Sequence, residues 1–256
     1  MNENMVAKGK TSRLQLNANQ IKLMAIIAMT IDHLTWALWP GCQHVWYVFA
    51  LHMIGRLTAP IMWFFIAEGC YYTRDIKKYA LRLFVFAIVS HFAYCFAGGI
   101  ELNPTIGSVF NRTSVMWPLA LAVVLVSIVR REDVKQWMKY VCIFAFCLLA
   151  FPADWSSIAV MAPLFIYLHR DNRRRQMFDI VMWSFVYAVV YVTCIDKLYG
   201  VLQMFTFLSI PVLSMYNGQR GKWKGMKWLF YIYYPAHLFV IGLIRLALHG
   251  DIPIIF

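Results

Sequence analysis

The chain has 256 residues, of which 61% are hydrophobic and only 14% are charged. Soluble domains are about half apolar, so this composition excludes an ordinary soluble domain and indicates an integral membrane protein. The net charge of +12 is explained by basic loops at one membrane face, and we therefore expect no nucleic-acid partner. Residues 1–19 are polar, and no small-residue cleavage site follows the first apolar stretch. We expect a cytoplasmic N-terminal segment there and a retained first span.

Apolar stretches long enough to cross a bilayer recur along the rest of the chain. A hydrocarbon core needs roughly 20 apolar residues per helix, which predicts an all-α, polytopic bundle of about nine transmembrane helices within one domain, residues 20–256. The expected spans are residues 20–39, 48–72, 78–97, 114–130, 137–152, 156–169, 177–195, 198–216 and 227–249. The fifth and sixth are short and contain Pro152 and Pro163, so a broken pair that dips into the membrane is the alternative.

The basic residues predict the orientation of these spans. Five segments with four basic residues each, at 8–22, 74–82, 130–139, 170–175 and 220–227, hold all but four of the 24 lysines and arginines. Such residues collect in cytoplasmic connections and contact anionic lipids. The alternation places the N-terminus in the cytoplasm and, with nine spans, the C-terminus outside.

The loops and cysteines add weaker signals. Six cysteines are scattered without a C-x-x-C pair, so we expect no metal. Cys42 and Cys194 fall near the outer surface, where a disulfide is one possibility. The connection GGIELNPTIGSVFNRTS at residues 98–114 is suited to a lid or a short re-entrant turn.

Polar residues at bilayer depth are functional candidates by default. In the first span, IKLMAIIAMTIDH, Lys22 and His33 are eleven positions apart. Helix geometry places them on one face, about 16 Å apart along the axis. Lys22 is then near the cytosolic headgroups and His33 near or beyond the midplane. Asp32 is adjacent to His33 and is turned about 100° away.

The second span contains His52 and Arg56, one helical turn apart. Arg56 lies in an apolar stretch at middle depth, where a buried charge needs an anionic partner. Asp32 is the first candidate and Glu68, at the inner end of the same span, is the second.

The last span contains LFYIYYPAHLFV, in which Tyr233 and Tyr234 precede His237 by four and three residues. A phenol can therefore share the face of this histidine. Pro235 lacks a backbone donor, so we expect a kink there that frees a carbonyl at membrane depth.

Three spans thus bring His33, Arg56 and His237 to similar depths. A neutral histidine can take a proton near pH 7 and an arginine can hold developing negative charge, a combination suited to acyl transfer. Without a nucleophilic serine or cysteine beside the base, direct transfer is favoured. The alternative is purely structural: a histidine bonded between helices and an Arg56–Asp32 ion pair. Ser90, His91, Gln203 and Arg245 we interpret as packing or interfacial residues.

The succession IKLMAIIAMTIDH, IGRLTAPIMWFFIAEGCYYTRDIKKYALRL, MYNGQRG and FYIYYPAHL resembles the TraX family, whose namesake acetylates the N-terminus of pilin. The resemblance runs from about residue 20 to residue 245, and residues 98–200 match only as hydrophobic helices. TraX-like proteins are similar in turn to the broader membrane acyltransferase-three superfamily. The first helix of that superfamily carries a basic residue, ten intervening positions and a histidine, a pattern that Lys22 and His33 fit.

The resemblance implies a bacterial inner-membrane acyltransferase that moves an acetyl or other short acyl group from cytoplasmic acetyl-CoA or another acyl-CoA to an acceptor at the outer face. The acceptor implied is a pilin amine, a glycan hydroxyl or a lipid headgroup, and the oligomeric state stays open. The expected catalytic residues are His33 as base, with Asp32, Arg56 and His237. Those expected to bind substrate are Lys22, His52, Glu68, Tyr233 and Tyr234. Those expected to hold the CoA phosphates lie in the loop YNGQRGKWKGMK and are Asn217, Arg220, Lys222, Lys224 and Lys227. The rival hypotheses are a transporter of a small organic anion and a non-catalytic scaffold.

Overall fold

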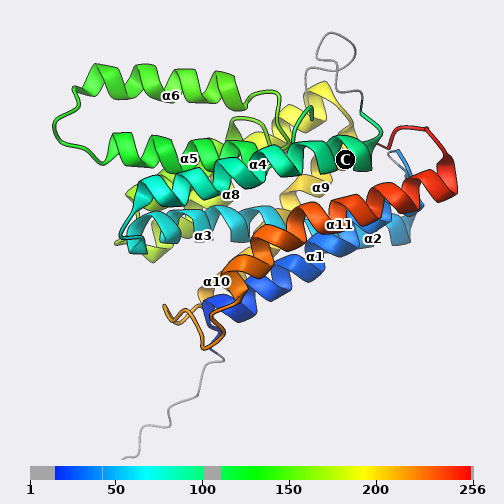
Figure 1. Ribbon diagram of the computed structural model, residues 1–256, viewed down its shortest axis with the longest axis horizontal. Coiled ribbons are helices and arrows are strands. Elements are labelled where there is room, and N and C mark those ends of the chain that lie inside the picture. Colours follow the sequence, from blue (N-terminus) through cyan, green and yellow to red (C-terminus); the bar gives the residue numbers. More distant parts are fainter. Residues whose placement is uncertain (1–14, 42, 101–110, 255–256) are drawn as a thin grey trace, which may run out of the picture.

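The computed structural model describes residues 15–41, 43–100 and 111–254, and these form helices joined by loops (Figure 1). The helices are α1 (Ala18–Leu38), α2 (Trp46–Gly55), α3 (Thr58–Tyr72), α4 (Ile76–Gly98), α5 (Met116–Val129), α6 (Gln136–Ala150), α7 (Ile158–Leu168), α8 (Arg173–Cys194), α9 (Lys197–Gln203), the 3₁₀ helix η1 (Met204–Leu208), α10 (Ser209–Ser214) and α11 (Met226–His249).

The expected all-helical membrane architecture is confirmed. Within the described ranges, six helical segments are long and apolar enough to cross a bilayer, namely α1, α2 with α3, α4, α8, α9 through α10, and α11. Three shorter apolar helices, α5, α6 and α7, occupy the positions of the fourth, fifth and sixth expected spans. The chain is therefore a polytopic helical membrane protein, and the sides on which its termini lie remain a prediction.

Two of the expected spans are interrupted helices. The span at 48–72 breaks at Arg56 and Leu57, between α2 and α3. Pro60 causes this break, because it has no N–H to donate to the carbonyl of Arg56. The span at 198–216 passes through η1 before Pro211 in α10. By contrast, α11 continues as one helix through Pro235, so the expected kink does not interrupt it.

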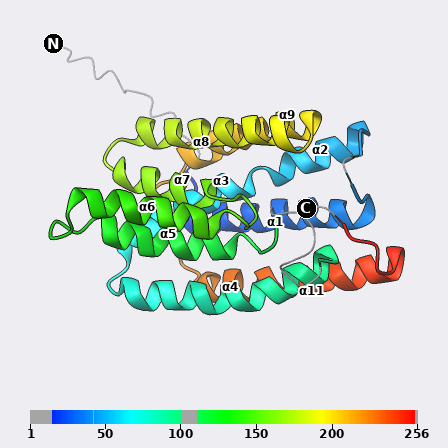
Figure 2. The same cartoon turned by 90° about the horizontal axis from the view of Figure 1, so that it is seen from above.

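The helices run roughly along one direction in three groups (Figure 2). One side is formed by α8 and α9, the opposite side by α4 and α11, and α1, α3, α5 and α7 lie between them. Helix α3 packs against α1, α5 and α7 and is the centre of the bundle. Helix α6 packs only along its α5 and α7 side and lies at the edge of the molecule (Figure 1).

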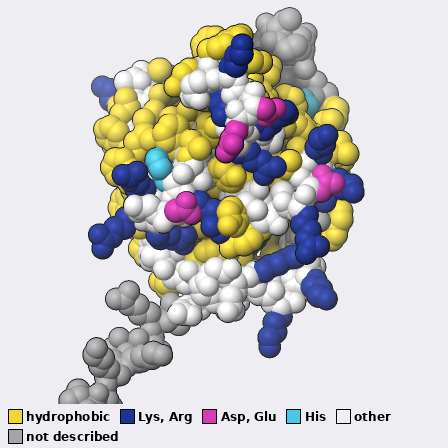
Figure 3. Space-filling view, turned by 90° about the vertical axis from the view of Figure 1, so that its left-hand side faces the viewer, with side chains coloured by type: hydrophobic (Ala, Val, Ile, Leu, Met, Phe, Trp, Pro, Cys, Tyr) yellow, Lys and Arg dark blue, Asp and Glu magenta, His cyan; other side chains and the backbone are white. Residues whose placement is uncertain are grey.

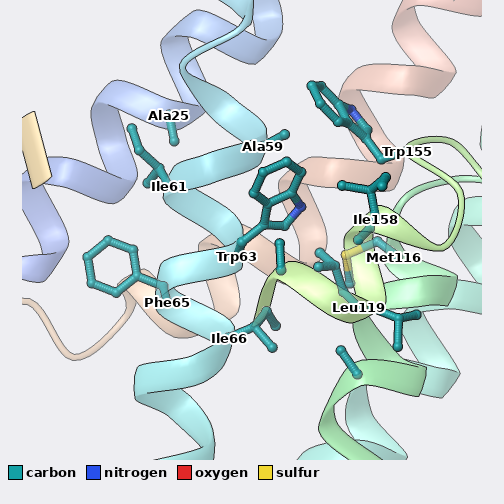
Figure 4. Packing of buried hydrophobic residues seen from close by; sticks show 14 of the residues in the cluster. Ala25, Ala59, Ile61, Trp63, Phe65, Ile66, Met116, Leu119, Trp155 and Ile158 are labelled. Atoms are coloured by element: carbon teal, nitrogen blue, oxygen red, sulfur yellow. The ribbon is translucent and has the colours of Figure 1, made fainter. Parts of the chain in front are cut away.

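Large apolar side chains occupy both the centre and the periphery. Trp63 and Phe64 of α3 are fully buried, and alanines such as Ala25 and Ala59 let neighbouring helices approach them (Figure 4). On the outer helices, Phe144 and Phe178 are 67% and 66% exposed. An apolar exterior matches lipid, and close packing through small residues holds membrane helices together.

The described parts of the basic segments gather at one end of the bundle, as the charge pattern predicts. The loops after α3, α5, α7 and α10 lie toward the same end of the molecule as the start of α1 (Figure 1). Figure 3 looks onto it and shows lysine and arginine side chains spread around the face. We call this the basic end.

Two expectations fall partly outside the described residues. Cys42 lies in such a gap, and Cys194 is an exposed free thiol, so the disulfide stays a prediction. The lid at 98–114 includes residues 101–110, which lie outside the described ranges as well.

Candidate active site

Asp32 of α1 is the centre of a buried ionic cluster. Its Oδ1 lies 2.7 Å from Nδ1 of His52, and its Oδ2 accepts a hydrogen bond from Nη2 of Arg56 at 2.5 Å. Arg56 also donates from Nη1 to Oε1 of Gln203 at 3.0 Å and from Nε to the carbonyl of His52 at 3.3 Å. All four side chains are buried. The expected Arg56–Asp32 pair is thus present, whereas Gln203 is a direct partner of Arg56 rather than simple packing.

The close approach of α1 and α2 depends on Gly55. A Cβ atom at this position would overlap the side chain of Asp32. The residue before Arg56 therefore has to lack a side chain for the ion pair to form. The sequence shows the glycine directly before Arg56, but its role becomes clear only from the packing of α1 against it.

A second network joins α1 to α11 through two histidines. Nδ1 of His33 lies 2.7 Å from Nε2 of His237, and Nδ1 of His237 lies 3.0 Å from the carbonyl of Tyr233. A carbonyl only accepts, so Nδ1 of His237 donates and its Nε2 accepts from Nδ1 of His33. This order places the proton-accepting lone pair of neutral His33 on Nε2. Tyr233 stacks on His237 at 5.2 Å, and its hydroxyl lies 2.7 Å from that of Thr30.

His33 lines a small cavity of about 60 Å³, here called the histidine cavity. Asp32 and Arg56 form part of the same wall. The remaining wall is mainly apolar and aromatic, with Trp36, Met62, Met116, Leu119, Trp155, Tyr187, Tyr191, Phe230 and Tyr234 among its residues. A proton acceptor and a buried cation therefore face one confined space.

A strained turn between α6 and α7 delivers two further residues to this cavity. Trp155 and Ser156 both have positive φ, at 62° and 47°, a conformation that residues other than glycine rarely adopt. The backbone of Asp154 donates to the carbonyl of Thr113 at 2.8 Å, which anchors the turn. The Asp154 carboxyl and the Trp155 ring line the cavity. Sequence reasoning missed both, although a proline and an acidic residue, Pro152 and Asp154, mark the position between two short apolar segments.

A larger cavity of about 610 Å³ opens at the basic end. We call it the basic cavity. Its cationic lining residues come from α1, α4 and the loops after α3 and α10, and they are Lys22, Arg74, Arg82 and Arg220. Glu68 also lines it and lies 3.3 Å from Arg170, so Glu68 does not compete with Asp32 for Arg56. Burial and the Glu68 carboxylate raise the pKa of the Tyr216 phenol to about 12, which keeps a neutral hydrogen-bond donor in this cavity.

The two cavities share part of their walls. Met62, Met116 and Phe230 line both of them. Lys22 lies in the basic cavity and His33 in the histidine cavity, in agreement with their common face on α1. Lys22 in the basic cavity and His33 in the histidine cavity are therefore about 16 Å apart along α1.

Several predicted site residues lie elsewhere. His52 is fully buried behind Asp32, and neither it nor His237 nor Tyr233 lines the histidine cavity or the basic cavity. His237 therefore supports His33 from behind, while Tyr234 does reach the histidine cavity. In the loop before α11, Arg220 lines the basic cavity, but the exposed Lys222 and Lys224 do not. The Asn217 side chain accepts from the backbone of Gln219 at 2.9 Å. The Lys227 side chain lies outside the described part of the structure.

Comparison with known proteins places the chain in a family. A probable fimbrial assembly protein, FimC of serogroup H1, from Dichelobacter nodosus is 27% identical over 235 residues, which cover 88% of this chain and 94% of that protein. No solved structure matches the chain. The family model described as TraX protein matches residues 17–245, and the chain therefore belongs to the TraX family.

Proposed function

We propose that this protein is an acyl-CoA-dependent membrane acyltransferase with His33 as its general base, related to the membrane acyltransferase-three superfamily. The observation that carries the proposal is a pair of neighbouring cavities that share part of their walls. A chamber lined by four cations shares Met62, Met116 and Phe230 with a confined space that contains an imidazole and a guanidinium. A donor for this arrangement has an anionic head and a reactive carbon at the end of a long arm. Acyl-CoA has that shape and charge.

The first step is placement of the donor. Phosphates bind lysine and arginine side chains through charge-assisted hydrogen bonds, and the basic cavity offers Lys22 and Arg220 near the start of α1. From there the arm has to cover about 16 Å along α1 to reach His33. The pantetheine arm then passes between Met62, Met116 and Phe230, and the thioester carbonyl stops beside the imidazole.

The second step is direct transfer. The acceptor nitrogen or oxygen attacks the thioester carbonyl carbon and forms the new bond, while its proton moves to Nε2 of His33. The carbon–sulfur bond then breaks, the electron pair leaves with the CoA sulfur, and the resulting thiolate takes the proton from His33. The base is regenerated, and the products are the acylated acceptor and free CoA.

Arg56 has donors left for the negative charge that develops on the carbonyl oxygen. A guanidinium has five N–H donors, and three of them are engaged by Asp32, Gln203 and the His52 carbonyl. Two N–H groups remain on a side chain that already lines the histidine cavity. Because its partners fix the guanidinium in advance, stabilisation of the oxyanion needs little reorganisation.

The acceptor class is suggested by the relative. The D. nodosus protein is named as a probable fimbrial assembly protein, which supports a pilus or fimbrial subunit as the acceptor here, presented at the outer face of the bacterial inner membrane. An amine of such a subunit meets the chemical requirement of the second step. A glycan hydroxyl or a lipid headgroup also meets it.

The test is transfer of radiolabelled acetyl groups from acetyl-CoA in membranes that contain the acceptor pool. His33→Gln is expected to lower transfer by at least about 100-fold, the usual contribution of a general base, and to leave acetyl-CoA binding intact. The matched control is His91→Gln, because His91 is another histidine in a span but contacts Thr113 and lines neither cavity. Transfer by His33→Gln at the rate of the His91→Gln control would remove His33 from the chemistry.

One observation favours a second candidate, an organic-anion transporter. Interrupted helices beside a buried charge are typical of transporter substrate sites, and here α2 and α3 break at Arg56, whose partner Gln203 ends α9 just before η1. Acyl-CoA binding by the purified protein separates the two. An acyltransferase has to bind acyl-CoA, whereas a carrier of a small anion does not.

A further inference from the structure

The histidine cavity contains an acidic residue that the proposed transfer does not use. Asp154 lines its wall together with Asp32, His33 and Arg56. Two carboxylates therefore face one guanidinium, and the wall carries one net negative charge when His33 is neutral. Asp32 engages that guanidinium through the hydrogen bond from Nη2 of Arg56. Within the described ranges, no ion pair reaches Asp154.

The turn that carries this second carboxylate is held rigidly. The backbone N–H of Arg112 donates to the carbonyl of Pro152 at 2.7 Å. Trp155 stacks on Tyr187 with ring centroids 4.4 Å apart, and Trp63 meets the Trp155 ring edge-on at 5.3 Å (Figure 4). The positive φ of Trp155 is a strained conformation, which persists only where the surrounding structure holds it and is concentrated at functional sites. The turn therefore presents the carboxylate at a fixed place in the cavity wall.

The groups around Asp154 do not neutralise its charge. Arg56 lies near enough to attract it, but Arg56 is already bonded to Asp32. The other ionisable neighbours of this carboxylate are phenols, which are either uncharged or negative, and they are Tyr94, Tyr187 and Tyr234. A carboxylate in such a place is stabilised by a proton or by a cation that enters the cavity. Asp154 is only partly buried, so a ligand in the cavity can reach it.

We propose that Asp154 is a further catalytic residue, which holds the acceptor as an ammonium ion and takes its first proton. The inference rests on the proposed function, because it needs His33 to take the second proton. A primary amine is mostly protonated near pH 7, and an ammonium nitrogen has no lone pair with which to attack a thioester. It has to lose two protons before it becomes an amide nitrogen, and one imidazole accepts only one of them. A hydroxyl acceptor loses a single proton and has no need of a second base.

Each of the two protons has a defined path. One moves from the ammonium to a carboxylate oxygen of Asp154 and leaves a neutral amine, which attacks the thioester carbonyl carbon. The other moves to Nε2 of His33 as the new carbon–nitrogen bond forms, and the CoA thiolate takes it when the carbon–sulfur bond breaks. Asp154 then returns its proton to water. The products are the amide, the CoA thiol and one released proton.

This order also suits the role proposed for Arg56. A negative charge beside Arg56 would repel the oxyanion that forms on the thioester carbonyl. Once Asp154 has taken its proton it is neutral, so this repulsion is absent when the oxyanion develops. The amide product is neutral as well. The negatively charged wall therefore attracts the ammonium substrate more strongly than the product, which favours product release.

The experiment combines the pH profile of transfer with the type of bond that is formed. Membranes with the acceptor pool receive radiolabelled acetyl-CoA, the label found in membranes without the protein is subtracted, and mild alkali then cleaves esters but not amides. We expect alkali-stable label for the wild type. Asp154→Asn is expected to lower transfer at pH 7 by at least about fivefold, because no more than about a fifth of a primary amine is uncharged there. By pH 9 this deficit is expected to shrink by at least about threefold, because the fraction of free amine rises.

The matched control is Asp179→Asn. Asp179 is a buried acid of α8 that lies 2.8 Å from His169 and lines neither cavity, so this variant is expected to keep the wild-type pH profile. Asp154→Glu retains a carboxylate and is expected to keep that profile too. If Asp154→Asn does not fold, the Glu variant and the bond type in the wild type still test the inference.

Four results would overturn the inference alone. They are alkali-labile label in the wild type, wild-type transfer by Asp154→Asn at pH 7, a deficit in this variant that stays constant up to pH 9, and a deficit in Asp154→Glu that shrinks as the pH rises. Absence of transfer by the wild type would instead remove the proposed function.

Discussion

Asp32 and His33 are neighbours in α1, yet they belong to networks of different character. Asp32 contacts His52 and Arg56 directly, and Arg56 in turn donates to Gln203. All of these partners lie within the protein. His33 belongs to a chain of imidazoles that runs to a backbone carbonyl of α11. The first network compensates the buried charge of Asp32 with that of Arg56 and joins α1 to α2 and α9. The second orders protons along neutral rings beside a cavity.

This difference shows how polar residues in a membrane protein can be sorted. Depth alone marks both residues as functional candidates. The number and kind of their partners separate them, because a fully compensated ion pair can be structural, whereas an ordered histidine on a cavity wall is equipped for proton transfer. Substitutions in the two networks should therefore fail in different ways.

The largest effect is expected for Asp32→Asn. It leaves the guanidinium of Arg56 buried without its anion, and breaking a buried pair in this way costs about 3–5 kcal/mol. The expected result is a large fall in thermal stability and in the yield of folded protein, measured by size-exclusion chromatography after heating. Activity should fall with this loss of structure, and protein that still folds should lose only what Asp32 contributes by holding Arg56 in place.

Asp133→Asn is the control for Asp32→Asn. Asp133 pairs with Arg131 on the surface, where their side chains are 64% and 60% exposed, and such pairs contribute little to stability. We expect no measurable change in heat resistance for this variant. An Asp32→Asn protein that is as stable as the wild type would contradict the comparison, because the ion pair would then not be needed for the fold.

The second-largest effect is expected when His237 is substituted, because His237 orients His33. His237→Leu removes the acceptor for Nδ1 of His33 and so releases its tautomer and ring orientation. Groups that orient a functional imidazole in metal sites contribute about 10–100-fold, and we expect a fall in kcat of that order with an unchanged KM for acetyl-CoA. His237→Gln should recover part of the activity, because its amide oxygen can accept the same hydrogen bond. Equal kcat in the Leu and Gln variants would show that the hydrogen bond does not matter.

Much of this arrangement follows from the sequence through helix geometry. Periodicity places Lys22 and His33 on one face, and the rarity of charges at bilayer depth pairs Arg56 with Asp32. Both inferences need only one helix or two sequential helices. They succeed because local geometry decides them.

The remaining residues depend on contacts between distant segments. Gln203 reaches Arg56 from a helix 147 positions later in the chain, and neither periodicity nor charge marks that approach. Asp154 and Trp155 enter the histidine cavity on a turn with positive φ at a tryptophan and a serine, a conformation that residue propensities argue against. Tertiary packing selects it, so one sequence without coordinates could not predict it.

The smallest effect is expected in the basic cavity, where Arg220 and Lys224 lie in one loop but differ in place. Arg220 lines the cavity and Lys224 does not. A cation beside an anionic surface contributes about 1 kcal/mol, so Arg220→Gln should weaken CoA binding by about fivefold, with a smaller loss at high salt because exposed charges are screened. Lys224→Gln should leave the affinity measured by isothermal titration nearly unchanged. If both variants lose affinity equally and high salt abolishes the loss, the donor is attracted by the summed charge of the basic end rather than held by the cavity wall. At this end of the molecule, CoA would then be attracted by the overall positive charge and not by a specific site. The proposed role of the histidine network would be unchanged.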